Sequence, residues 1–235
     1  MSASSWFASP RHGPLPALLL LLTLGTGLVD AVSILALGRV FVANMTGNIV
    51  FIGFALAGAP GFSLAAALVA LAGFLVGAGV AGPLIGLLHH HRGRVLAVVT
   101  TAETALLGAA LIVAALTAEP FGAAPRNLIA GLAAVALGMQ NTAARELAVP
   151  DATTTVLTMT LTGVAADLRE RNVPVLLRRV FAVAAMLLGG LVGALLVLNL
   201  SAAAALAPAV VLVAAVSLAA WLVSRRPAPW HERGR

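Results

Sequence analysis

The sequence predicts an all-α membrane protein with about six transmembrane helices and two short polar broken or re-entrant segments, arranged as an inverted repeat. Hydrophobic residues make up 61% of the chain and charged residues only 9%, whereas soluble domains carry roughly 25% charged residues. The mean hydropathy is +1.05. Such a chain cannot form a water-soluble surface, so lipid must solvate much of its helical surface. We therefore expect a single polytopic membrane domain over residues 1–235, with cytoplasmic tails at 1–14 and 224–235.

Six apolar stretches are long enough to cross a hydrocarbon core, which needs about 20 helical residues. In chain order they cover residues 15–37, 62–88, 95–118, 127–147, 177–200 and 206–223. The first stretch follows Arg11 and also resembles a secretory signal peptide with a cleavage site near residues 31–33. Its apolar run continues to Leu37, which is longer than a signal core needs and favours a retained helix.

Two further segments, 40–58 and 152–168, are too polar for ordinary lipid-facing helices. Eight crossings result if both segments span the membrane, and six if both are broken, half-length or re-entrant. Six crossings with a cytoplasmic N-terminus leave only Arg39 and Arg126 outside, and the other arginines inside. Eight crossings place four arginines outside. The positive-inside rule therefore favours six crossings with both termini in the cytoplasm.

The chain contains a weak internal repeat. Three pairs of segments match in order, at offsets of 111, 114 and 112 residues: 27–30 with 138–141, 44–48 with 158–162, and 72–78 with 184–190. The two halves cover about 15–118 and 127–223, and each contains three full crossings. Halves with an odd number of crossings must insert in opposite orientations, which predicts an inverted repeat like that of many transporters.

Two motifs resemble a known family. Val29-Asp30-Ala31 is followed by the polar stretch 44–48, and Gln140-Asn141 is followed by the threonine-rich stretch in the second half. The chain resembles the YoaK-like family of bacterial membrane proteins (domain of unknown function 1275) over about residues 15–223. The resemblance implies a multi-spanning protein of the bacterial inner membrane, and it implies no established activity.

Asp30 is the most unusual residue of the predicted membrane interior. It lies about four residues past the midpoint of the first helix, hence roughly 6 Å from the membrane centre. An ionised Asp there costs on the order of 3 kcal/mol, and such residues usually face a bundle interior, a partner or water. Asp30 could bind a proton, a cation or a substrate amine, or it could be a neutral structural hydrogen-bonding group. Asn141 occupies the related position in the second half.

The polar segments contain residue types that are common at helix starts. Asn44, Thr46 and Asn48 would cap free backbone N–H groups, and a helix N-terminus inside the membrane would present a partial positive charge to an anion. Thr158 and Thr162 could add hydroxyl groups. Alternatively, threonines bond their own helix and asparagines fasten neighbouring helices, each contributing about 1 kcal/mol or less. The candidate pathway residues are Asp30, Asn44, Thr46, Asn48, Gln140, Asn141, Thr158 and Thr162.

Other features suggest structural roles. The Gly73/Gly77 and Gly189/Gly193 pairs have the GxxxG spacing that permits close helix packing. Glu103 could pair with an arginine, take part in proton movement or form a structural hydrogen bond. Residues 89–91 are consecutive histidines, whose side chains do not converge on one ligand, so we expect no metal site there. We expect an unstructured C-terminal tail with Trp230 at the membrane interface.

These features favour a small-solute transporter or channel-like protein, with a pathway between inverted halves and Asp30 as the coupling group. The alternative is a non-transporting membrane scaffold or assembly factor. We expect no enzyme and no cofactor, because the chain lacks cysteine and the common catalytic motifs HExxH and GxSxG. The expected partners are the lipid bilayer and a small solute or ion, with no nucleic acid. Self-association into a homo-oligomer is also consistent with the sequence.

Overall fold

The structure is a bundle of long α-helices. This computed structural model describes residues 12–88, 91–149, 154, 158, 160–164, 173–226 and 228–231. The long helices are α2 (Leu15–Ala36), α4 (Leu64–Leu88), α5 (Arg92–Leu116), α6 (Ala123–Leu147), α8 (Val173–Asn199) and α9 (Ala202–Ser224). A short helix, α3 (Met45–Leu56), follows α2, and a single 3₁₀ turn, η1 (Pro229–His231), follows α9. The all-α membrane fold class is confirmed, and the ends of each long helix lie within four residues of the predicted positions.

Five of the described helices are both long and apolar enough to cross a bilayer: α2, α4, α5, residues Val175–Asn199 of α8, and α9. Helix α6 is also 25 residues long but contains Arg126, Gln140 and Arg145. It tolerates these polar residues because it packs against both α4 and α5, where lipid contacts it less. Intramembrane polar side chains usually face such protein surroundings.

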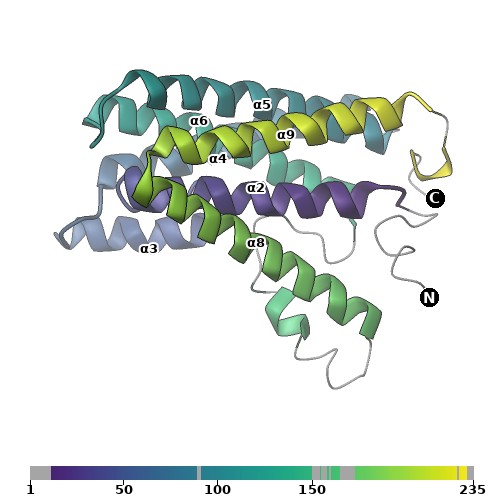
Figure 1. Ribbon diagram of the computed structural model, residues 1–235, viewed down its shortest axis with the longest axis horizontal. Coiled ribbons are helices and arrows are strands. Elements are labelled where there is room, and N and C mark those ends of the chain that lie inside the picture. Colours follow the sequence, from purple (N-terminus) through teal and green to yellow (C-terminus); the bar gives the residue numbers. More distant parts are fainter. Residues whose placement is uncertain are drawn as a thin grey trace.

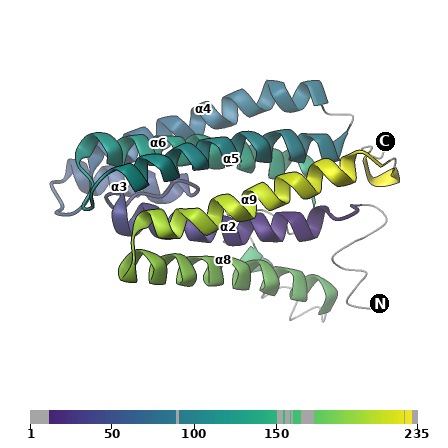
Figure 2. The ribbon, with the colours of Figure 1, turned by 45° about the horizontal axis from the view of Figure 1, so that its top comes forward.

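Successive long helices run in alternating directions between two ends of the bundle (Figures 1 and 2). At one end, here called the terminal face, Arg92 at the start of α5 donates hydrogen bonds to His12 Nδ1 (3.1 Å) and to the Leu147 carbonyl at the end of α6. At the other end, the far face, Glu119 accepts a hydrogen bond from the N–H of Ala202, 2.8 Å away, at the start of α9. Helices α2, α5 and α8 therefore run toward the far face, and α4, α6 and α9 run back.

The first polar segment is short and returns to the face from which it came. Helix α3 has 12 residues, so its length is about 18 Å, which is too short for a core of about 30 Å. Residues 37–44 turn inward from the far-face end of α2, and α3 then leads back toward the start of α4 (Figure 1). Gly61, beyond α3, contacts the Arg39 side chain. The second polar segment lies mostly outside the described residues, of which 158 and 160–164 are helical.

Glycines at two helix crossings allow backbones to touch. A methyl group on Gly77 of α4 would overlap with the Val135 carbonyl oxygen of α6, and one on Gly189 of α8 would overlap with the Leu24 carbonyl oxygen of α2. The packing role predicted for the GxxxG pairs is confirmed at these crossings. The contact is reciprocal, since Gly138 of α6 lies against α4 in the same way.

The C-terminal tail is folded where the structure describes it, so the prediction of an unstructured tail is wrong for residues 228–231. Trp230 and His231 are only 8% and 5% exposed. The Trp230 ring packs against Gly13 and Gly93, and the His231 ring stacks on His91 with 4.1 Å between centroids. Burial of the large indole between two glycines favours this docked position over the membrane interface.

Candidate functional site

The turn between α2 and α3 is held in place by Asn48. Its side chain is fully buried, and its Oδ1 accepts a hydrogen bond from Phe41 N–H (2.8 Å) while its Nδ2 donates to the Phe41 carbonyl (2.5 Å). The predicted helix cap is wrong in detail, because Asn44 makes no capping hydrogen bond at the start of α3. Asn48 instead satisfies both backbone groups of Phe41, which would otherwise lack a partner at membrane depth.

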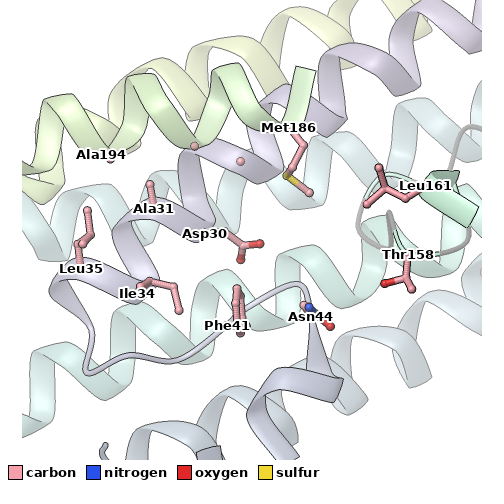
Figure 3. A pocket seen from close by; sticks show the side chains of 12 residues that line it. Asp30, Ala31, Ile34, Leu35, Phe41, Asn44, Thr158, Leu161, Met186 and Ala194 are labelled. Carbon is pink, nitrogen blue, oxygen red and sulfur yellow. The ribbon is translucent and has the colours of Figure 1, made fainter. Parts of the chain in front are cut away.

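The ordered turn forms one wall of a cavity of about 520 Å³. Helices α2 and α8 form the opposite walls, and residues of the second polar segment close one side. Figure 3 shows the Asp30 carboxyl group directed toward Phe41 and Asn44, with Thr158 and Leu161 beyond them. The lining consists of Gly27, Asp30, Ala31, Ile34, Leu35, Phe41, Asn44, Thr158, Leu161, Met186, Gly190 and Ala194.

Among the described residues of this lining, Asp30 supplies the one charged group. Its Oδ1 atom is buried and has no hydrogen-bond partner within the described part of the chain. The backbone amides of Val42 and Ala43, in the turn, lie close to the carboxyl group. The turn that shapes the cavity therefore also presents backbone N–H groups to Asp30.

The structure brings three of the predicted pathway residues, Asp30, Asn44 and Thr158, together at the cavity. Their sequence separations are large, and only the return of residues 37–44 into the bundle places Asn44 beside α2. Asn44 and Thr158 are also equivalent residues in the sequence repeat. Equivalent positions of the two halves thus meet at one cavity.

The other predicted pathway residues do not line this cavity. Thr46 is exposed, and Thr162 is exposed with its hydroxyl donating to the Thr158 carbonyl (3.0 Å). Gln140 is buried and its Nε2 donates to Thr26 Oγ1 (3.0 Å) and Thr154 Oγ1 (2.8 Å). Asn141 is half-buried on α6, and Asn48 holds the turn. Gln140 therefore fastens α6 to α2, and Asn48 fastens the turn, so both have structural roles of the kind that the sequence left as the alternative.

Sequence analysis missed the apolar part of the lining. Phe41, Ile34, Leu161 and Met186 contact the cavity but have no distinctive pattern in a chain that is mostly apolar. The repeat offered one signal for Met186. The repeat matches it with Phe74. The carbonyl oxygens of both residues lie against glycines where two helices cross, Met186 against Gly27 and Phe74 against Gly138.

Glu103 lies apart from the cavity in the middle of α5. It is fully buried, and neither carboxyl oxygen has a hydrogen-bond partner among the residues that the structure describes. The arginine pair and the structural hydrogen bond considered for it are therefore not seen there. The described residues also contain no group of three or more His, Asp or Glu side chains able to hold a metal ion. The chemistry of the cavity rests on Asp30, Asn44 and Thr158.

The long apolar helices and their alternating directions define a multi-pass α-helical membrane protein. A family model described as "Protein of unknown function (DUF1275)" matches residues 18–219, and the chain belongs to this family. It is similar to the UPF0700 transmembrane protein YoaK of Bacillus subtilis (strain 168), with 34% identity over 154 residues that cover 66% of this chain and 67% of the relative. The resemblance predicted from the motifs is confirmed. No solved structure matches the chain.

Proposed function

We propose that this protein is a small-solute transporter or channel-like protein whose binding site is the Asp30 cavity. The observation that supports this function is a cavity of about 520 Å³ with Asp30, Asn44 and Thr158 in its wall. Ligand sites are typically 300–1,000 Å³, mainly apolar, with a few convergent polar groups. The Asp30 cavity has these properties inside a membrane protein.

The lining favours a small cationic solute. One carboxyl group, one amide and one hydroxyl group face a space that is otherwise lined by aliphatic, aromatic and thioether side chains. A carboxylate at membrane depth is costly without a counter-charge, so a monovalent cation, a protonated amine or a proton would stabilise it. Asp30 is accordingly the candidate coupling group, with Asn44 and Thr158 as polar contacts for the solute.

We further propose that the two halves form an inverted repeat about an axis in the membrane plane. Helices α2, α4 and α5 run opposite to their counterparts α6, α8 and α9. The crossing of α4 with α6 corresponds to that of α8 with α2, because Gly77 contacts Val135 and Gly189 contacts Leu24 at equivalent repeat positions. Transporters with inverted repeats bind their substrates at the interface between the repeats, which is where Asn44 and Thr158 meet.

The arginine distribution supports an orientation in the bacterial inner membrane with the terminal face in the cytoplasm. Arg92, Arg94, Arg145 and Arg225 lie at the terminal-face ends of their helices, whereas Arg39 and Arg126 lie at the far face. Cytoplasmic loops carry an excess of Arg and Lys.

The test is Asp30→Asn in proteoliposomes that contain a pH-sensitive dye. Na⁺, K⁺ and ethylammonium gradients would be imposed separately, and the resulting proton flux measured against empty liposomes. We expect the wild-type protein to support flux with at least one of these cations and Asp30→Asn to lose it, because the amide cannot exchange a proton or neutralise a cation. Glu119→Gln is the matched control, since the glutamine side chain keeps an oxygen acceptor for the Ala202 N–H outside the cavity.

Unchanged flux in folded Asp30→Asn protein would remove Asp30 from the coupling role. The absence of flux in every gradient, with Asp30 inaccessible to water, would favour the scaffold alternative. The buried Gln140, Thr26 and Thr154 cluster is the observation that points that way. Elution volume in size-exclusion chromatography and the thermal unfolding midpoint would establish that the variants are folded.

A further inference from the structure

Two arginines depart from the charge bias of the chain, and they lie close together. Arg39 follows α2 and Arg126 lies in the first turn of α6, both at the far face. A methyl group on Gly38 would lie 3.5 Å from Arg126 Cδ and 3.8 Å from Arg126 Nε. Arg39 is the next residue in the chain. The Arg126 side chain therefore packs against the turn that carries Arg39, although the two residues are far apart in the sequence.

The Arg39 side chain borders a second cavity, of about 460 Å³, which is distinct from the Asp30 cavity. Its guanidinium carbon lies 5.6 Å from the centroid of the Phe62 ring, and Phe62 in turn packs on Phe51 at 5.1 Å between centroids. The adjacent Gly61 also lies against the guanidinium group. The remaining lining is Ile34, Leu35 and Gly38. Arg39 is thus oriented over an apolar and aromatic pocket.

Within the described part of the chain, no carboxylate pairs with Arg39 or Arg126. Arg126 Nε is buried and has no hydrogen-bond partner within the described residues. Among the described residues, the Arg39 guanidinium group lies close to Phe62 and Gly61, and no carboxylate lies within ion-pair distance of it. A guanidinium group without a counter-charge favours an anion, and guanidinium groups match phosphate oxygens in geometry.

We propose that Arg39 binds the phosphate group of an anionic phospholipid, with an acyl chain against Phe51 and Phe62, and that the positive charge of Arg126 beside Gly38 strengthens the binding. The apolar wall favours a lipid over a free phosphate, because Leu35, which lines the cavity, and Phe54, which packs on Phe51 and Phe62, are 46% and 45% exposed. Exposed apolar side chains of a membrane protein contact acyl chains. The site lies at a helix end, where a headgroup lies in a bilayer.

Phospholipid binding at Arg39 does not require that the protein transports a solute. Ile34 and Leu35 nevertheless line both this cavity and the Asp30 cavity. A bound acyl chain would therefore pack on the back of the wall that carries Asp30. The Gly38 and Gly61 backbones have positive φ angles, 90° and 85°, so the turn that shapes the site depends on glycine at these positions.

The test measures phospholipid binding to the purified full chain by native mass spectrometry in detergent. Phosphatidylglycerol and phosphatidylcholine with identical acyl chains would be titrated separately, with inorganic phosphate as the free-anion probe. We expect phosphatidylglycerol to bind more tightly, and Arg39→Gln and Arg126→Gln each to weaken its binding about fivefold, since one surface arginine contributes roughly that much. Arg145→Gln is the matched control, because Arg145 is an exposed arginine at the other end of α6.

Three results would overturn the proposal. Equal affinity for the two phospholipids would exclude charge recognition, and an equal loss in Arg145→Gln would show a general surface effect. Displacement of phosphatidylglycerol by millimolar inorganic phosphate would assign the site to a free solute. Arg39→Lys preserves the charge and is expected to keep most of the binding, so it tests the site even if a neutral variant is unstable.

Discussion

Four glycines show most directly how single residues determine this fold. Gly27, Gly77, Gly138 and Gly189 lie where helix backbones cross, and a methyl group at any of them would meet a backbone atom of the facing helix. A backbone cannot move aside as a flexible side chain can. Helix association in membranes relies on close van der Waals packing, so these four positions are under strong steric restriction.

Gly189→Ala should destabilise the protein by about 2 kcal/mol or more, as overpacking does in tightly packed cores. Gly77→Ala should have a similar effect, because its surroundings in α6 match those of Gly189 in α2. Gly82→Ala is the control, since nothing lies within 4 Å of its added methyl group. The measurement is thermal unfolding in detergent. Equal unfolding midpoints for Gly189→Ala and Gly82→Ala would contradict the crossing geometry.

The candidate site was partly predictable from single residues. Asp30 is conspicuous in a chain with few charges, and the repeat related Asn44 to Thr158 before their positions were known. Asn48 and Gln140 have the same polar character but bond to Phe41 and to Thr26. Side-chain chemistry alone cannot separate these roles, because they depend on which backbone or hydroxyl group lies opposite each amide.

At the scale of elements, the C-terminal tail depends on contacts distant in sequence. Residues 228–231 pack on Gly13 before α2 and on His91 and Gly93 at the start of α5. The two glycines make room for the Trp230 ring. No periodic pattern in the sequence relates these glycines to Trp230, which is more than a hundred residues from either of them. The tail was therefore predicted to be unstructured.

Docking of the tail should weaken at acidic pH. Burial lowers the pKa of His231 below its ordinary value of 6.5, and the neighbouring His91 and Arg94 lower it as well, while the Val223 backbone opposes them. The undocked tail therefore binds protons more readily than the docked tail. Docking is at full strength above pH 6.5 and weakens as pH falls through the lowered pKa.

The measurement is electron paramagnetic resonance of a spin label attached at Ala228→Cys, which is half-buried beside the turn. We expect the mobile fraction of the label to increase between pH 8 and pH 5.5. The same label in a His231→Gln background should show little change, because glutamine does not titrate over this range. An equal pH response in both proteins would assign the effect to another group.

At the scale of the whole molecule, hydropathy was sufficient to predict the six long helices, and the GxxxG spacing predicted close packing without identifying the partner helices. The apolar runs had to match the bilayer thickness, and the glycines had to lie where helices touch. The return of residues 37–44 into the bundle is harder to predict, since it depends on Asn48 bonding to Phe41 rather than on composition. The Arg39 pocket was missed for a similar reason, because Leu35, Phe51 and Phe62 come from α2, from α3 and from the loop after α3.

The alternating directions of the long helices lead to a topology prediction. Because the native chain has no cysteine, Ala123→Cys at the far-face start of α6 and Arg226→Cys at the terminal-face end of α9 would each be the sole thiol. Both positions are exposed. A membrane-impermeant maleimide should label position 123 in intact cells and position 226 only after permeabilisation. Labelling of both positions from one side would contradict the bundle, because α6 and α9 would not then both cross from the far face to the terminal face. Labelling of position 226 alone would keep the bundle but invert its orientation. Arg39 and Arg126 would then lie in the cytoplasm, and they would no longer be exceptions to the positive-inside rule.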